Sequence, residues 1–307
     1  MKIKITILLI LSSLTLYSQD LISPIPTYIN FDKKKASLGK ALFFDPILSR
    51  DKTISCATCH ILEDGGDDNL PVSIGINGQK GDVNAPTVLN AVYNFRQFWD
   101  GRAKDLKEQA AQPIENPKEM GFNFKDLIKR LKNSYYNKMF KKIYKDGVTK
   151  NNILDAIAEY EKTLITPNSP FDRYLRGDKD ALTKKQKEGY ELFKTKGCIT
   201  CHHGVNIGGN MFNRFGVFQD PKTSNLGRYN VTKKESDKYF FKVPTLRNIE
   251  KTAPYFHDGR TYSLKEAVLL MAEYQLGRKI TVDEIEKIVS FLKSLTGQLL
   301  KVDLEND

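Results

Sequence analysis

Two copies of the pattern C-x-x-C-H constrain this chain more than any other feature of its sequence. The first copy is CATCH at residues 56–60, and the second is CITCH at residues 198–202. The 307-residue chain has four cysteines, and these two copies contain all of them. The chain must therefore fold so that each half presents the same set of two thiols and one imidazole.

Several kinds of site use paired cysteines, and the spacing favours one of them. An exported chain with four cysteines suggests disulfides by default, but a disulfide across two intervening residues would close only a very small loop. Zinc needs four ligands, whereas this motif supplies three at a closer spacing than zinc fingers use. Thiol redox motifs lie in a βαβ context that the sequence does not show, and C-x-x-C-H is the attachment signature of c-type haem.

In that chemistry the two thiols form thioethers to the porphyrin edge, and one helical turn brings the histidine under the iron. We therefore predict two covalently bound haem c groups. Each is held by two cysteines and ligated by the following histidine: Cys56, Cys59 and His60, and Cys198, Cys201 and His202.

The first twenty residues combine a basic start, an apolar run and a small polar exit. This pattern is typical of a secretory signal peptide, and its apolar core is shorter than the about 20 residues that a transmembrane helix needs. We expect residues 1–18 to be removed, which leaves an exported chain that starts near Gln19 and has no membrane span.

Removal of Lys2 and Lys4 with this leader lowers the formal net charge from +11 to +9. A basic surface can steer acidic partners, although a solvated lysine-rich surface such as residues 138–145 explains the charge equally well. No zinc finger, helix-turn-helix or arginine-rich arm indicates nucleic-acid binding.

Repeated blocks indicate an internal duplication. APTVLN at residues 85–90 corresponds to VPTLRN at 243–248, and the DGR and LKE blocks that follow keep the same offset of 158 residues. GKALF precedes the first motif, and GYELF precedes the second. The predicted fold class is mainly α: two tandem c-type cytochrome domains with haem-binding loops, related by internal duplication.

Helix signals support this class. Capping boxes at residues 183–186 and 281–284 begin helices that we expect to end at Gly197 and Gly297, and a third helix spans residues 153–164. EDGGDD at residues 63–68 is predicted to be a solvated turn.

TPNSP at residues 166–170 breaks the helical pattern and is the best linker candidate. We therefore divide the chain into a signal peptide (1–18), an N-terminal haem domain (19–166) and a C-terminal haem domain (167–307).

The offset of 158 residues also shows how the two halves differ. It pairs Trp99 with His257, and Pro113 with Met271. A methionine thioether is an axial ligand that raises the haem potential, whereas proline offers the iron nothing. Met271 could equally be a core residue, so the sequence leaves both interpretations open.

One closed haem beside one open haem suits the two-electron reduction of a small oxidant. Peroxide fits best, because cleavage of its O–O bond needs a proton moved between the oxygens by an acid/base. The sequence does not choose among four candidates for that role: Glu108, Gln109, Glu115 and Glu119.

Five segments resemble the bacterial dihaem cytochrome c peroxidases, and the resemblance runs from about residue 38 to residue 297. They are LGKALFFDPILSRDKTISCATCH, NAPTVLNAVYNFRQFWDGRAKDLKEQA, NPKEMG, ITPNSPFD and TAPYFHDG. The resemblance implies a periplasmic enzyme that reduces hydrogen peroxide to water. Its electrons would come from a small cytochrome c or a cupredoxin, and a homodimer is possible.

The resemblance also implies roles for single residues. Met271 resembles the axial ligand of the C-terminal, electron-entry haem, and Trp99 the aromatic residue between the haems. Gln109 and Glu119 resemble the polar residues of the peroxide pocket, with Glu119 as the acid/base. A calcium ion between the domains would be held by the Asn84 side chain and two backbone carbonyls, those of Thr252 and Pro254.

The chain departs from the family at one position. Many dihaem peroxidases close the N-terminal haem at rest with a loop histidine, and the corresponding residue is Ile76. Isoleucine cannot bind iron, so we expect an open N-terminal haem and no need for reductive activation.

Two alternatives remain at this point. A related dihaem enzyme oxidises tryptophans of a partner protein, but it carries a tyrosine where this chain has Met271. A non-catalytic electron-transfer cytochrome would instead have two six-coordinate haems.

Overall fold

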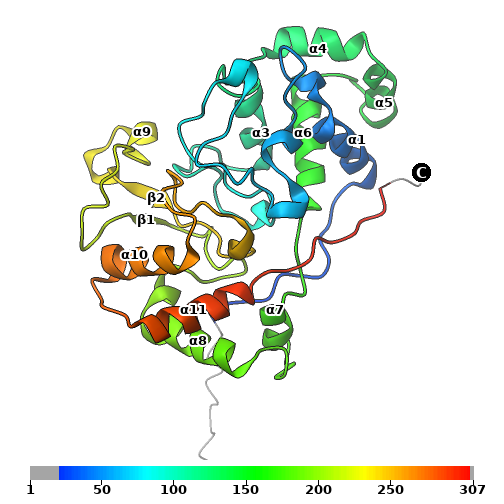
Figure 1. Cartoon of the computed structure of the whole chain (residues 1–307). Helices are drawn as coiled ribbons and strands as arrows, with labels where there is room; N and C mark the ends of the chain where they lie inside the picture. The colour runs from blue at the N-terminus through cyan, green and yellow to red at the C-terminus, as the bar shows by residue number, and fades with distance from the viewer. Residues whose placement is uncertain (1–20, 305–307) are drawn as a thin grey trace, which may run out of the picture.

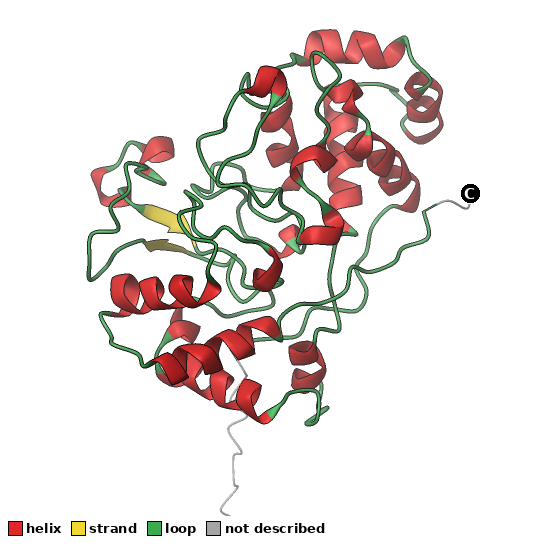
Figure 2. Ribbon diagram, in the orientation of Figure 1, coloured by secondary structure: helices red, strands yellow, loops and turns green. Residues whose placement is uncertain are grey.

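A computed structural model describes residues 21–304, so the predicted signal peptide lies outside the described residues. This part of the chain is mainly helical and contains one two-stranded antiparallel sheet (Figure 2). Across the same residues, no helix combines the length and apolar character needed to span a bilayer. The helical elements of the structure confirm the predicted mainly α fold class.

The elements divide into two sets that follow one another along the chain (Figure 1). The first set is α1 (Lys33–Phe44), α2 (Cys56–Cys59), α3 (Leu106–Glu115), α4 (Phe124–Lys132), α5 (Tyr136–Ile143) and α6 (Lys150–Lys162). The second set is α7 (Pro170–Leu175), α8 (Lys184–Thr195), β1 (Phe212–Arg214), α9 (Tyr229–Thr232), β2 (Phe240–Lys242), α10 (Leu264–Leu276) and α11 (Val282–Lys293).

Each set is built around one close helix crossing. Helix α1 packs on α6, and α8 packs on α11. The helices approach at Gly39 and Gly189, where an added Cβ would overlap the backbone carbonyl oxygens of Ala156 and Lys287, respectively. These glycines begin the repeated GKALF and GYELF blocks, so the two crossings are the same structural feature built twice.

Backbone conformation confirms the duplication. Asn90 and Asn248 share a φ of 60°, and Phe98 and Phe256 have φ values of 67° and 72°. Helices α3 and α10 begin 158 residues apart, at the two LKE blocks. Left-handed backbone is uncommon for residues other than glycine, so its recurrence at matched positions reflects a shared fold.

The predicted linker is a buried joint between the two sets. Thr166 is 1% exposed, and its Oγ1 accepts hydrogen bonds from Asn90 Nδ2 at 2.8 Å and Asn248 Nδ2 at 3.0 Å. The two asparagines are repeat equivalents, so both halves bind the same hydroxyl. The proposed domain boundary at residue 166 stays a prediction.

The chain ends cross over between the halves. Ile22 packs in an apolar cluster with Phe171 and Phe291 of the second set, and Leu304 packs with Phe43 and Tyr160 of the first. In Figure 1 the blue N-terminal and red C-terminal segments run side by side between the sets.

A buried ion pair fixes the N-terminal segment. Arg247 Nη1 lies 2.8 Å from Asp172 Oδ1, and both side chains are fully buried. Arg247 also donates to Ser23 O, while Asp172 accepts from the Ile25 backbone N–H. Such a pair is costly to break because either partner alone would leave an uncompensated buried charge.

Both predicted capping boxes are present. Thr183 begins α8 and Thr281 begins α11, and Gly197 follows α8 with a φ of 100°. The predicted role of Gly297 is wrong, since α11 ends at Lys293 and is capped by Ser294. At Gly297 a Cβ would overlap the carbonyl oxygen of Thr166, so glycine is needed there for close approach.

The crossing of α8 and α11 makes the first prediction. Gly189→Ala should lower the thermal midpoint by roughly 3–10 °C, because overpacking costs about 1–3 kcal/mol and outweighs the better helix propensity of alanine. Lys184→Ala, on the exposed start of the same helix, is the control and should change the midpoint little. Equal midpoints for both variants would show that the crossing tolerates a methyl group.

Candidate functional site

The first C-x-x-C-H motif forms α2 and ends at a histidine with a defined tautomer. His60 Nδ1 lies 2.9 Å from Gly66 O. A carbonyl oxygen only accepts, so Nδ1 carries the hydrogen and Nε2 keeps its lone pair for a metal. Burial lowers the pKa of His60, which favours the neutral ring that a metal requires.

Next to this motif is a cavity of about 380 Å³, here called the first cavity. Cys59 and His60 line it, together with Pro113, Gln109 and Glu119 from α3 and the segment after it. Pro113 therefore lines the cavity of the first half, just as Met271, its repeat equivalent, lines the cavity of the second half. The other two candidates for the acid/base role lie outside the lining and are exposed: Glu108 and Glu115.

Glu119 is one of the acidic side chains that line this cavity, and it comes from the segment after α3. Burial raises the pKa of its carboxyl, and the nearby Arg102 limits the rise. Asn116 Nδ2 donates to Glu119 Oε1 at 2.6 Å, which fixes the orientation of the carboxyl group. A positioned carboxyl with a raised pKa suits proton transfer near neutral pH.

Ile76 does not face this cavity. Its side chain is fully buried against Gly121, and its backbone N–H donates to Glu119 O at 2.8 Å. The loop that carries it is therefore docked on the segment that carries the acid/base candidate.

Within the described residues, His60 is the histidine that lines the first cavity. His203 instead lies 2.9 Å from Asn210 through its Nδ1. His257 lines the cavity of the other half, and its Nε2 lies 2.8 Å from Thr223 Oγ1. Neither histidine therefore lines the first cavity, so neither replaces the loop histidine that the family has at the position of Ile76.

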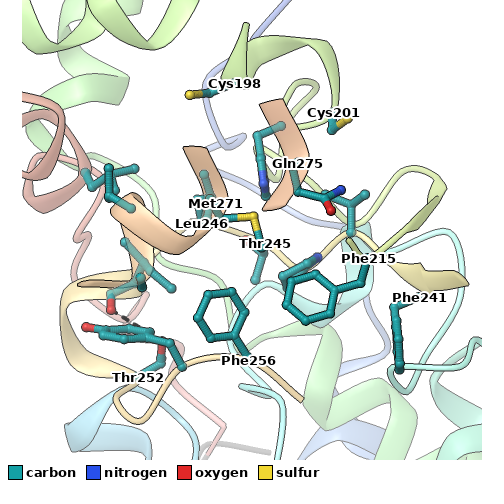
Figure 3. A pocket seen from close by; sticks show the side chains of 18 of the residues that line it. Cys198, Cys201, Phe215, Phe241, Thr245, Leu246, Thr252, Phe256, Met271 and Gln275 are labelled. Carbon is teal, nitrogen blue, oxygen red and sulfur yellow. Dashed lines mark hydrogen bonds between the residues drawn. The ribbon is translucent and has the colours of Figure 1, made fainter. Parts of the chain in front are cut away.

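The second motif opens on a cavity of about 230 Å³, here called the second cavity. Its lining includes Cys198, Cys201, His202 and Met271. Figure 3 shows the two cysteines at one end and the Met271 sulfur, which comes from α10, facing the space below them. Burial lowers the pKa of His202 to about 4, so this ring is neutral at ordinary pH.

Trp99 connects the two cavities, because it lines both. Its Nε1 donates to Asn84 O at 2.9 Å, and its ring centroid lies 6.2 Å from that of His257, its repeat equivalent. This contact between equivalent residues places Trp99 where the halves meet.

The three residues of the expected calcium site, Asn84, Thr252 and Pro254, all line the second cavity. Asn84 Nδ2 donates to Leu70 O at 2.9 Å, which leaves the amide oxygen as the atom able to bind a cation. Across residues 21–304 no cluster of three or more His, Cys, Asp or Glu side chains could hold a metal. A cation here would depend mainly on amide and carbonyl oxygens, as calcium sites commonly do.

Asp67 corrects the prediction of a solvated turn at residues 63–68. The side chain is 1% exposed, both carboxylate oxygens have no hydrogen-bond partner, and burial raises its pKa to about 7. It lines the second cavity. Gly65 in the same loop packs against the Lys251 carbonyl, and Leu70 is bonded to Asn84, so the loop lies beside the expected calcium ligands.

Sequence reasoning missed three buried charged side chains that line these cavities: Asp67, Glu161 and Lys242. Glu161 is 5% exposed with its Oε2 unpaired, and burial raises its pKa to about 8. A charged residue within an otherwise apolar stretch, such as Lys242 in FFKVP, was the available signal.

The donor set fits haem c. All four cysteines are free thiols, and in each half the half-buried C-x-x-C-H histidine and its second cysteine line a cavity. The Met271 thioether lines the second cavity, where it would be available as a further ligand to a haem iron, whereas Pro113 lines the first.

Comparison with known proteins agrees with this chemistry. The family model "Di-haem cytochrome c peroxidase" matches residues 33–180, and the model "Cytochrome c" matches residues 186–296. The chain is 51% identical to a cytochrome c551 peroxidase of Nitrosomonas europaea over 280 residues, which cover 90% of this chain and 84% of that protein.

A cytochrome c551 peroxidase of Pseudomonas aeruginosa is 46% identical over 299 residues, which cover 92% of this chain and 86% of that one. Among solved structures, a MauG-like protein associated with microbial copper homeostasis superposes with a TM-score of 0.80. It is 25% identical, and the match covers 93% of this chain and 96% of that structure.

Proposed function

Because this chain belongs to the bacterial dihaem cytochrome c peroxidases, we propose distinct roles for its two haem sites in the reduction of hydrogen peroxide. Electrons enter at the C-terminal haem from a small cytochrome c or a cupredoxin and pass to the N-terminal haem. The observation that carries this proposal is the asymmetry of the cavities: Met271 lines the second, whereas Pro113 and Glu119 line the first.

The overall reaction is H2O2 + 2e⁻ + 2H⁺ → 2H2O. The two haem groups supply one-electron redox chemistry and the metal at which peroxide is reduced. The chain supplies His60 and His202 as iron ligands, and Met271 as the further ligand that raises the potential of the electron-entry site.

Within the first cavity, Glu119 accepts a proton from one peroxide oxygen and delivers it to the other. Gln109, from the facing turn of α3, orients the peroxide through its amide. Trp99 lies between the cavities and provides an aromatic path between the two sites. Support for these roles comes from the lining of each cavity and from the raised pKa of Glu119.

We also propose that the enzyme works in the periplasm, on the strength of the leader-like residues 1–18. Cell fractionation of the full chain tests this. Steady-state turnover with purified small cytochromes and cupredoxins tests the donor, and sedimentation of the holoprotein tests for a homodimer.

The alternatives have less support. An enzyme that oxidises a partner protein is expected to have tyrosine at the place of Met271, and the chain is more similar to peroxidases than to the MauG-like structure. A purely electron-transferring cytochrome would need a second iron ligand in the first cavity, where Pro113 takes the repeat position of Met271.

The acid/base role makes a prediction about pH. Glu119→Gln should bind peroxide yet lose about 10²- to 10⁴-fold in turnover, the usual share of a general acid/base. The base form is the carboxylate, so wild-type activity should fall as the pH drops through the raised pKa of Glu119. The variant should lack this acidic limb.

Glu115→Gln, on the exposed end of α3, is the matched control and should retain wild-type rates. Steady-state kinetics across pH measures both variants. An unchanged acidic limb in Glu119→Gln would assign the limb to another group.

The proposed iron ligands make a spectroscopic prediction. Electron paramagnetic resonance of the fully oxidised protein should show one low-spin and one high-spin haem, and turnover should begin without pre-reduction. Met271→Ala should remove the low-spin signal, while Met139→Ala, in the N-terminal apolar cluster, should leave it. Two low-spin signals in the wild type, with a lag abolished by pre-reduction, would contradict an open N-terminal site.

We further propose that calcium binds at Asn84, Thr252 and Pro254, with the unpaired Asp67 carboxylate as its counter-charge. Burial without a partner is costly for a carboxylate, and a divalent cation would offset that cost. Asp67→Asn should weaken calcium binding by roughly 10- to 100-fold, as measured by calorimetry on chelator-treated protein. Asp64→Asn, an exposed acid of the same loop, should bind calcium like the wild type; equal affinity for both variants would separate Asp67 from the cation.

A further inference from the structure

Lys242 is a buried cation without a counter-ion. It ends β2, is 4% exposed, and burial lowers its pKa to about 8. Throughout residues 21–304, no carboxylate oxygen lies within 4 Å of its ammonium group. A buried charge is costly unless it is paired, so the charged form of Lys242 calls for an anion that the polypeptide does not provide.

The backbone holds Lys242 at the junction of the two halves. Its N–H donates to Trp99 O at 2.7 Å, and it pairs with Phe212 in the sheet register. The side chain lines both the first and the second cavity. The other residues shared by the two linings are uncharged: Asn84, Ala85, Pro86, Thr87, Asn94, Trp99 and Phe241.

The geometry of the second cavity identifies the missing anion. A c-type haem is attached through thioethers at one edge and carries two propionate carboxylates at the opposite edge. Cys198 and Cys201 line the second cavity alone, whereas Lys242 lines both cavities and therefore lies where the two meet. We expect the carboxylate edge of a haem attached at these cysteines to face this junction.

We propose that Lys242 binds a haem propionate at the junction of the two cavities and is the fixed positive charge between the two redox sites. This inference rests on the proposed attachment of haem at the two motifs. The acids that line the cavities do not replace the propionate, because Asp67, Glu119 and Glu161 form no ion pair with Lys242.

Such a charge has an electrostatic consequence. Reduction adds an electron to a haem, and a nearby cation stabilises the added charge more strongly where the surroundings have a low dielectric constant. Lys242 therefore raises the potential of the haem whose propionate it binds, independently of the axial ligands.

The test is a spectroelectrochemical titration of both haems in the holoprotein. Lys242→Met keeps the apolar stem and removes the charge, and it should shift at least one midpoint potential downward. Lys242→Arg keeps the charge and should stay near the wild type. Lys184→Met is the control: Lys184 is exposed at the start of α8 and lines neither cavity, so both potentials should stay unchanged.

Resonance Raman spectroscopy provides a readout at the ligand itself, since the propionate bending bands should shift in Lys242→Met and not in Lys184→Met. Unchanged potentials and bands in Lys242→Met would overturn the inference, as would loss of a low-spin signal, which would make Lys242 an iron ligand. Haem content and wild-type peroxide turnover, measured in parallel, test the proposed function separately.

Discussion

The backbone-to-backbone approach of helices at Gly39 and Gly189 is the constraint on which both redox sites depend. With no side chain between them, α1 rests on α6 and α8 on α11, and the next turn of α1 or α8 brings an aromatic ring toward a motif histidine. Phe43 lies 6.5 Å from the ring of His60, and Phe193 lies 6.5 Å from that of His202. A larger residue at either glycine would separate the helices and shift the phenylalanine ring that contacts the motif histidine. The two motifs are thus positioned by a contact that is remote from any chemistry.

Duplication gives the two halves the same backbone framework, and the differences between their sites lie at a few repeat-equivalent residues. Helices α10 and α3 are repeat equivalents, and matching positions on them carry Met271 and Pro113. A thioether therefore lines one cavity and a proline ring lines the other. Trp99 and His257 are likewise equivalent, and they meet where the halves join. Divergence at such pairs is the basis on which we propose different roles for the two haem sites.

The features that the sequence predicted well are local or repeated. The capping boxes and the blocks repeated at an offset of 158 residues each depend on short stretches, and the structure confirms them. Burial of single charged residues depends on segments distant in the chain, and pattern alone missed it. Asp67 seemed a solvated turn residue because its neighbours are polar, yet the loop is covered by segments near residues 84 and 251. Gly297 similarly looked like a helix stop, whereas the neighbouring chain at Thr166 is what requires it.

The shared hydroxyl of Thr166 has a consequence for electron transfer over distance. Tunnelling rates fall steeply as the gap between donor and acceptor widens, so a hinge between two redox domains would make the rate fluctuate with the hinge angle. Here the equivalent asparagines of both halves bind one side chain that is 1% exposed, and the crossed termini tie the halves together a second time. Electron transfer between the two haem sites, as we propose it, would therefore take place over a distance that buried contacts hold fixed.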